Sequence, residues 1–138
     1  MEHDSILIVD DNPADIVLTE KVIKKSRPGI TIEHAANGLE TLDLLDKGNL
    51  PALIFLDYNM PGMDGIDVLK RMRNHPKTRY LPVVMLTSSN DDVDIKNSFN
   101  AGASFYLHKT YDLDTFTREI QVALHYWLDL NLSPDKAA

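Results

Sequence analysis

The chain has 138 residues and a formal net charge of −7 at pH 7, with 14 lysines and arginines against 21 aspartates and glutamates. This length corresponds to one domain, and a 43% share of apolar residues is enough for a hydrophobic core. The acidic balance argues against nucleic-acid binding, which usually needs a basic face. The absence of cysteine excludes disulfides, thiolate metal sites and a cysteine nucleophile.

Nothing in the sequence indicates export or membrane insertion. No apolar run approaches the roughly 18 residues of a membrane span. The acidic start over 1–4 and the short apolar run over 6–9 do not form a signal peptide, which has a basic start and a longer apolar stretch. We therefore expect a cytoplasmic protein with no membrane partner. One domain is expected over 1–130, with no separate output domain, followed by a frayed C-terminal tail over 131–138.

The first part of the chain predicts two strands, each followed by a helix. The run over 6–9 is a strand candidate, and 31–35 is a weaker one. A helix is expected to begin at Pro13, with Asn12 as its N-cap. Its apolar positions are Val17, Leu18, Val22 and Ile23. A second helix is indicated by leucines at every third position, Leu39, Leu42 and Leu45.

The remaining chain repeats this alternation. Apolar runs over 53–56 and 83–86 predict strands buried on both faces, and 105–107 is a weaker strand candidate. Between them lie a helix that stops before Pro76 and a more polar helix over 90–100. The last helix begins near Asp112. Its core stripe is expected to be Leu113, Phe116, Ile120 and Leu124.

Five alternating strands and helices predict an α/β fold with a parallel sheet covered by helices on both faces. Among doubly wound topologies, five strands fit the flavodoxin-like order 2-1-3-4-5.

Polar residues follow the ends of these predicted strands. In open parallel sheets, ligands bind beyond the carboxyl ends of the strands. The residues concerned are Asp10, Asp11, Asp57, Thr87, Ser88, His108 and Lys109. We expect their side chains to converge at one edge of the sheet.

Clustered carboxylates repel one another unless a cation lies between them. Mg²⁺ (or Mn²⁺) suits oxygen ligands of this kind. A lysine and a hydroxyl beside such an ion can stabilise a phosphoryl group, and a carboxylate can accept that group as an acyl phosphate. Asp57, at the end of the central strand, is the expected nucleophile. The turn-rich loop after it can bring the backbone carbonyl of Asn59 to the metal.

The ordered set of motifs resembles the receiver domain of two-component response regulators from about Ser5 to Trp127. The residues that carry the resemblance are Asp10, Asp11, Asp57, Asn59-Met60-Pro61-Gly62-Met63-Asp64-Gly65, Thr87, Ser88, Ala101-Gly102-Ala103 and Lys109. The resemblance implies a bacterial signalling protein rather than a turnover enzyme.

The resemblance also implies a role for each matching residue. Asp57 would accept a phosphoryl group from a histidine kinase or a histidine phosphotransfer protein. Asp10 and Asp11 would arrange the metal, with Asp11 as the expected direct ligand. Thr87 would bond to the phosphoryl group and Lys109 would pair with it. Tyr106 matches the aromatic switch position, so that Thr87 and Tyr106 together would report phosphorylation.

One position departs from the family pattern. Receivers usually carry a proline after the lysine, whereas Thr110 follows Lys109 here. Small single-domain receivers that partner cyanobacterial phytochromes look similar in this respect, in the stretch 53–65 and in the aromatic last helix.

Three other functions remain open from the residues alone. An aspartyl-nucleophile phosphatase or phosphotransferase is one, although Asn59 stands where such an enzyme would place a second aspartate. A flavodoxin-like electron carrier is another, although the acidic loop at 10–13 would repel a cofactor phosphate. The third is a receiver-like scaffold that never takes phosphate.

The last helix is more apolar than one core face requires. The residues beyond the core stripe are Val122, Tyr126, Trp127, Leu128, Leu130 and Leu132. Because large apolar patches mark interaction sites and aromatic residues are frequent at interface centres, a homodimer through Tyr126 and Trp127 is predicted. A helix end that folds back over its own domain, or a contact with the kinase, would explain the same pattern.

Overall fold

The computed structural model describes residues 5–48, 50–88, 91–109 and 112–131. Strands and helices alternate along the chain, and a π-helix, η1, follows the last α-helix. The elements are β1 (Ser5–Val9), α1 (Pro13–Ser26), β2 (Thr31–Ala35), α2 (Gly38–Asp46), β3 (Leu53–Asp57), α3 (Gly65–Arg73), β4 (Val83–Thr87), α4 (Asp92–Asn100), β5 (Phe105–His108), α5 (Leu113–Leu124) and η1 (His125–Leu130).

All neighbouring strands are parallel, and their order is β2-β1-β3-β4-β5. The predicted α/β fold and strand order are therefore confirmed. The register aligns the strand ends that matter for function. Val9 pairs with Leu56, which brings Asp10 beside Asp57, and Asp57 itself pairs with Leu86. Thr87 pairs with His108, so that Lys109 lies one residue beyond the end of β4.

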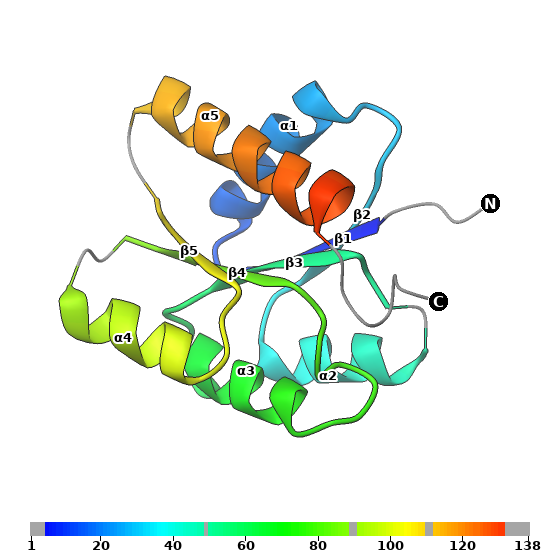
Figure 1. Ribbon diagram of the computed structural model, residues 1–138, viewed down its shortest axis with the longest axis vertical. Coiled ribbons are helices and arrows are strands. Elements are labelled where there is room, and N and C mark those ends of the chain that lie inside the picture. The colour runs from blue at the N-terminus through cyan, green and yellow to red at the C-terminus, as the bar shows by residue number, and fades with distance from the viewer. Residues whose placement is uncertain (1–4, 49, 89–90, 110–111, 132–138) are drawn as a thin grey trace.

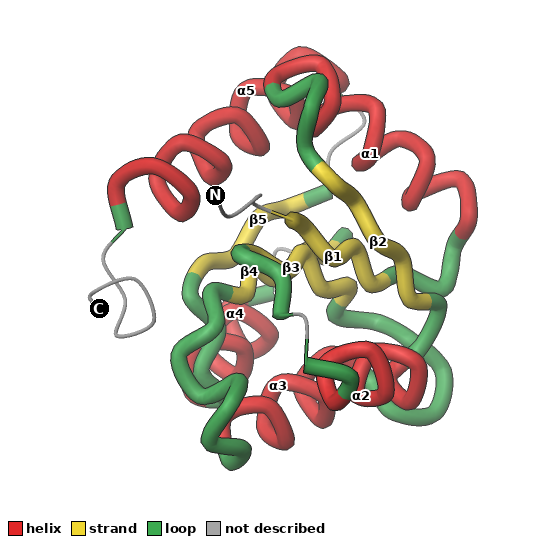
Figure 2. The backbone as a smooth tube through the Cα atoms, turned by 90° about the vertical axis from the view of Figure 1, so that its right-hand side faces the viewer, coloured by secondary structure: helices red, strands yellow, loops and turns green. Residues whose placement is uncertain are grey.

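Helices cover both faces of the sheet. Helices α1 and α5 lie on one face, and α2, α3 and α4 lie on the other (Figure 1), as the rotated view in Figure 2 also shows. Alternate residues of the inner strands supply the two cores. In β1, Ile6 and Ile8 pack toward α1 and α5, whereas Leu7 and Val9 belong to the core under α2 and α3. This double burial explains why the inner strands are apolar at successive positions.

Side-chain caps fix where each helix begins. Asn12 accepts a hydrogen bond from the backbone of Ala14, as predicted, so α1 starts directly after the loop that carries Asp10 and Asp11. Asp64 caps α3 in a reciprocal capping box with Asp67. These caps hold the helix N-termini close to the carboxyl edge of the sheet.

Glycine at position 65 is required by a close approach of two backbones. A Cβ atom added there would lie 2.5 Å from the carbonyl oxygen of Asp57. The amide of Gly65 also donates a hydrogen bond of 3.1 Å to the carbonyl of Tyr58. The start of α3 is thereby packed directly against the end of β3, where Asp57 is located.

Several positions assigned to helix core stripes are exposed instead. Val17, Leu18, Leu39 and Leu113 are all at least one-third exposed, whereas Thr19 and Thr41 are buried. The apolar periodicity located these helices but gave their inward faces only in part, since threonines occupy buried positions in α1 and α2.

The prediction for the C-terminal helix was partly wrong. Leu128 is 7% exposed and belongs to the core with α1 and α5, and Trp127 packs against the same cluster. An ion pair of 2.5 Å between Arg27 and Asp129 joins η1 to the end of α1. Helix η1 therefore does pack on its own domain, while Val122, Tyr126 and Leu130 stay exposed. The part of the sequence beyond 131 lies outside the described residues.

No helix within the described ranges is long and apolar enough to cross a membrane.

Candidate phosphorylation and metal site

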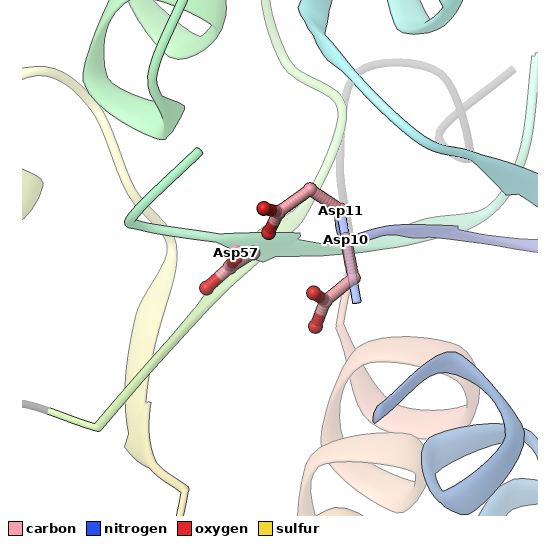
Figure 3. Close-up of side chains that lie close together, drawn as sticks. All are labelled: Asp10, Asp11 and Asp57. Atoms are coloured by element: carbon pink, nitrogen blue, oxygen red, sulfur yellow. The ribbon is translucent and has the colours of Figure 1, made fainter. Parts of the chain in front are cut away.

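Three carboxylates meet at the carboxyl edge of the sheet. Asp10 and Asp11 follow β1 and Asp57 ends β3, and their ligand oxygens lie within 4.8 Å of one another. Figure 3 shows that the three side chains come from adjacent strand ends. Asp10 is 2% exposed and Asp57 is 5% exposed, whereas Asp11 is open to solvent. The convergence predicted from the strand ends is thus present for these three carboxylates.

Lys109, which directly follows the edge strand β5, reaches this cluster with its side chain. Its Nζ lies 2.8 Å from Asp10 Oδ2 and 3.2 Å from Asp57 Oδ1. Its backbone amide donates a hydrogen bond of 2.6 Å to the carbonyl of Thr87, which continues the β4–β5 pairing. The bond between Lys109 and Thr110, where the sequence departs from the family pattern, lies outside the described residues.

The ionisation of these groups reflects their burial. Desolvation raises the pKa of Asp57 to about 7, even though the nearby Lys109 ammonium lowers it, and the charge of Asp10 adds to the increase. Burial would lower the pKa of Lys109, but the hydrogen bond to Asp10 and the surrounding carboxylate charges outweigh burial and raise it. One lysine therefore does not compensate for all the negative charge at this edge.

The hydroxyl of Thr87 links the site to β5. Thr87 is fully buried at the end of β4. Its side chain hydrogen-bonds to Tyr106, and this bond opposes the rise in the Tyr106 pKa that burial causes. Met85 pairs with Tyr106 in the sheet register. The two predicted switch residues are consequently in direct contact, and Tyr106 is partly exposed.

The loop after β3 contributes a backbone donor. The amide of Asn59 donates a hydrogen bond to the Asp57 carboxylate, which acts to lower the pKa of Asp57. The side chain of Tyr58 turns toward α4, where its hydroxyl donates a hydrogen bond of 3.1 Å to Asp94. Both residues that directly follow the phosphoacceptor candidate are therefore held by hydrogen bonds.

Asp15 was not anticipated as part of the site. Its carboxylate lies 3.2 Å from Lys109 Nζ. It sits in the first turn of α1, where an acidic residue is expected simply for its interaction with the helix dipole. The sequence offered no distinct signal for Asp15, because an acidic residue in the first turn of a helix is common without any role in a site.

The donor set fits a hard divalent cation. Carboxylate oxygens are the ligands that Mg²⁺ and Mn²⁺ prefer, and a third carboxylate beside a single lysine leaves the cluster short of positive charge. The arrangement places the buried Asp57 carboxylate 3.2 Å from an ammonium group and beside two further carboxylates, which is suited to phosphoryl transfer.

Comparisons with known proteins agree with this chemistry. Sporulation initiation phosphotransferase F of Bacillus subtilis is 36% identical and covers 94% of this chain and 98% of its own. Response regulator Rcp1 of Synechocystis is 32% identical over 90% of this chain and 88% of its own.

Solved structures superimpose closely. The phosphorylated cyanobacterial phytochrome response regulator RcpA has a TM-score of 0.88 at 28% identity and covers 96% of this chain and 99% of its own. The Mn²⁺-bound form of Rcp1 has a TM-score of 0.83 at 30% identity, over 95% and 99% of the two chains.

The sequence matches the response regulator receiver domain family over residues 6–121. With the strand order, the carboxylate cluster and the lysine already in place, this chain belongs to the family of response regulator receiver domains.

Proposed function

We propose that the protein is a phosphorylation switch in which Asp57 is the phosphoacceptor. The observation that supports this most directly is the position of Lys109 Nζ, 3.2 Å from the buried Asp57 carboxylate. Receiver domains accept phosphoryl groups in two-component signalling, and the donor here is a histidine kinase or a histidine phosphotransfer protein. We also propose that this signalling takes place in the cytoplasm, as expected from the sequence.

The proposed transfer is a single displacement at phosphorus. One oxygen of ionised Asp57 forms a bond to phosphorus while the bond from phosphorus to the imidazole nitrogen of the donor breaks, and the imidazole leaves with the electron pair. Lys109 neutralises the charge on the phosphoryl oxygens and Thr87 donates a hydrogen bond to one of them. The Asn59 amide keeps the nucleophile oriented.

A divalent cation, Mg²⁺ or Mn²⁺, would supply further charge neutralisation when bound. Asp10, Asp11 and Asp57 would hold it, together with the backbone carbonyl of Asn59. The close spacing of the three carboxylates supports this assignment, and Rcp1 has a structure in a Mn²⁺-bound form. We assign the receiver unit to 1–130 and a tail to 131–138, since the domain core extends to Leu128 in η1, and η1 ends at Leu130.

The first prediction concerns the acceptor residue. With Mg²⁺ and phosphoramidate or acetyl phosphate, the protein is expected to gain one phosphoryl group, and Asp57→Asn none, because the amide is not a nucleophile. Intact mass spectrometry measures both. Asp46→Asn is a suitable control because Asp46 is an exposed acid on α2. Equal labelling of the Asp57 variant would refute the assignment. Sustained turnover of a generic phosphate ester would favour the phosphatase alternative instead.

The second prediction concerns charge at the site. Without metal, Asp57 keeps a proton up to a pKa of about 7, compared with 3.8 for an ordinary aspartate. Between these values the unfolded chain binds fewer protons, so the free energy of unfolding falls as pH rises. In the presence of a chelator, the free energy of unfolding of Asp57→Asn should therefore rise relative to that of the wild type between pH 4 and pH 7. The increase should be at most about 1.4 kcal/mol per pH unit. Urea unfolding at several pH values measures this difference.

Adding Mg²⁺ should make the wild type more stable than Asp57→Asn, because bound cations stabilise the folded state. Asp11→Asn should lose most of the Mg²⁺ effect, and the exposed Asp43→Asn on α2 should keep it. A wild type whose unfolding midpoint ignores millimolar Mg²⁺ would contradict the metal assignment.

The contact between Thr87 and Tyr106 supports a route for the signal. When Thr87 turns its hydroxyl to a phosphoryl oxygen, its bond with Tyr106 is lost, and the Tyr106 ring can repack. This is a shift between two arrangements that phosphorylation biases. The surface affected would be α4, β5 and α5.

The third prediction follows from this route. Thr87→Ala is expected to accept phosphate more slowly but to lose the phosphorylation-dependent change in amide exchange over α4 and β5. Thr87→Ser keeps the hydroxyl and should retain the change, which makes it the matched control. Hydrogen exchange measured by mass spectrometry distinguishes them. A normal response in Thr87→Ala would place the coupling elsewhere.

We also propose a homodimer, now through the exposed apolar stripe Val122, Tyr126 and Leu130 along α5 and η1. These positions follow one another every four residues, so they share one side of the helix. Trp127, which the sequence suggested as a central contact, is partly buried against its own domain and takes a smaller part.

The fourth prediction tests this dimer by sedimentation. The wild type is expected to dimerise at tens of micromolar, whereas Tyr126→Ala combined with Leu130→Ser should remain monomeric. Leu39→Ser removes a similarly exposed apolar side chain from α2 and serves as control. Substitutions at Leu128 are unsuitable, because its burial would confuse dimerisation with folding. A wild type that stays monomeric when phosphorylated would end this proposal.

A further inference from the structure

The ammonium group of Lys109 is fully engaged before any phosphoryl group arrives. Lysine has three N–H donors, and three carboxylates surround this one. Asp10 Oδ2 lies at 2.8 Å, and Asp57 Oδ1 and Asp15 Oδ2 each lie at 3.2 Å. To bond to a phosphoryl oxygen, Lys109 must therefore release one of these partners.

The three partners differ in how easily they can be released. The side chains of Asp10 and Asp57 are 3% and 7% exposed, whereas that of Asp15 is 39% exposed. Asp10 also accepts a hydrogen bond of 3.0 Å from the amide of Asn12, which fixes it in place. Removing a counter-ion from a buried carboxylate is costly, while a surface carboxylate regains water at little cost.

Solvent reaches Asp15 through an open pocket. The pocket has a volume of about 390 Å³ and is bounded by Asp15, Lys109, Ser88 and His108, with Leu18 and Phe116 behind them. Asp15 thus faces water on one side and Lys109 on the other. Among the three carboxylates, it is the partner that Lys109 can exchange for a phosphoryl oxygen.

We propose that Asp15 is a positioning residue that restrains phosphorylation through Lys109. In the unphosphorylated protein it occupies one donor of the ammonium group, and it is displaced when the phosphoryl group binds. This inference rests on the proposed role of Asp57. The negative charge of Asp15 also lies beside the path by which an anionic phosphodonor would reach the site. Competition for Lys109 and charge repulsion both act to weaken binding of the donor.

The test compares Asp15→Asn with wild type at saturating Mg²⁺. The phosphoramidate concentration for half-maximal labelling is expected to fall about two- to fivefold, the effect of losing one half-exposed ion-pair partner, with the maximal rate unchanged. Beryllofluoride, an unreactive phosphoryl analogue, should bind more tightly by a similar factor, as measured by Tyr58 fluorescence. Asp15→Glu retains the negative charge, so its half-maximal phosphoramidate concentration and its affinity for beryllofluoride should match those of the wild type.

A matched control is available on the same helix. Glu20 pairs with His34, and its side chain is 30% exposed. Glu20→Gln therefore removes one charge from α1 without touching Lys109, and it should leave the half-saturating concentration unchanged. An equal shift of the half-saturating concentration in Glu20→Gln would mean that the effect comes from the overall charge of the protein, and it would overturn the inference.

Two further outcomes would also overturn it. A higher half-saturating concentration or a lower maximal rate in Asp15→Asn would mean that Asp15 orients Lys109 productively instead of restraining it. No change in either quantity would mean that Asp15 has no role. If the wild type itself is never labelled at Asp57, the proposed function fails and this inference fails with it, whereas normal labelling of the wild type confines the failure to Asp15.

Discussion

One ammonium group shared among buried carboxylates is the interaction on which the site depends. Lys109 bridges Asp10 and Asp57, which come from different strands and are nearly inaccessible to water. Isolated buried charges are strongly unfavourable, so neither carboxylate would tolerate this position alone. The raised pKa of Asp57 shows that the compensation is incomplete. A cluster that lacks positive charge favours the binding of a cation. The positive charge of that cation in turn assists the binding of phosphate.

The rest of the fold holds that cluster in place. The parallel register brings the ends of β1, β3, β4 and β5 to one edge, and side chains on both faces bury the strands. Gly65 lets α3 approach the carbonyl of Asp57, and the Asn12 cap starts α1 directly after Asp11. Asp57 ends a strand, and Asp10, Asp11 and Lys109 follow strand ends closely, so their positions depend on the packing of the strands beneath them.

Two contacts lead from this edge toward the surface. The Thr87 side chain bonds to Tyr106 on β5, and Tyr58, next to Asp57, bonds to Asp94 on α4. Both tyrosines are partly exposed. A change at Asp57 can thus be felt at α4 and β5 over a short distance. The apolar residues Val93, Phe99 and Phe105 lie exposed on the same elements, and they would be available to a partner that senses the change.

The sequence by itself determined the strand–helix order, the sheet topology and the convergence of Asp10, Asp11, Asp57 and Lys109. This was possible because parallel strands present their carboxyl ends at one edge and because apolar runs mark strands buried on both faces. Only the tertiary structure decided which apolar positions face inward, as at Leu113 and Leu128, since that depends on how each helix is rotated against the sheet. It also decided that Asp15 contacts Lys109, because the path of a flexible lysine side chain is set by packing and burial and leaves no periodic signal in the sequence.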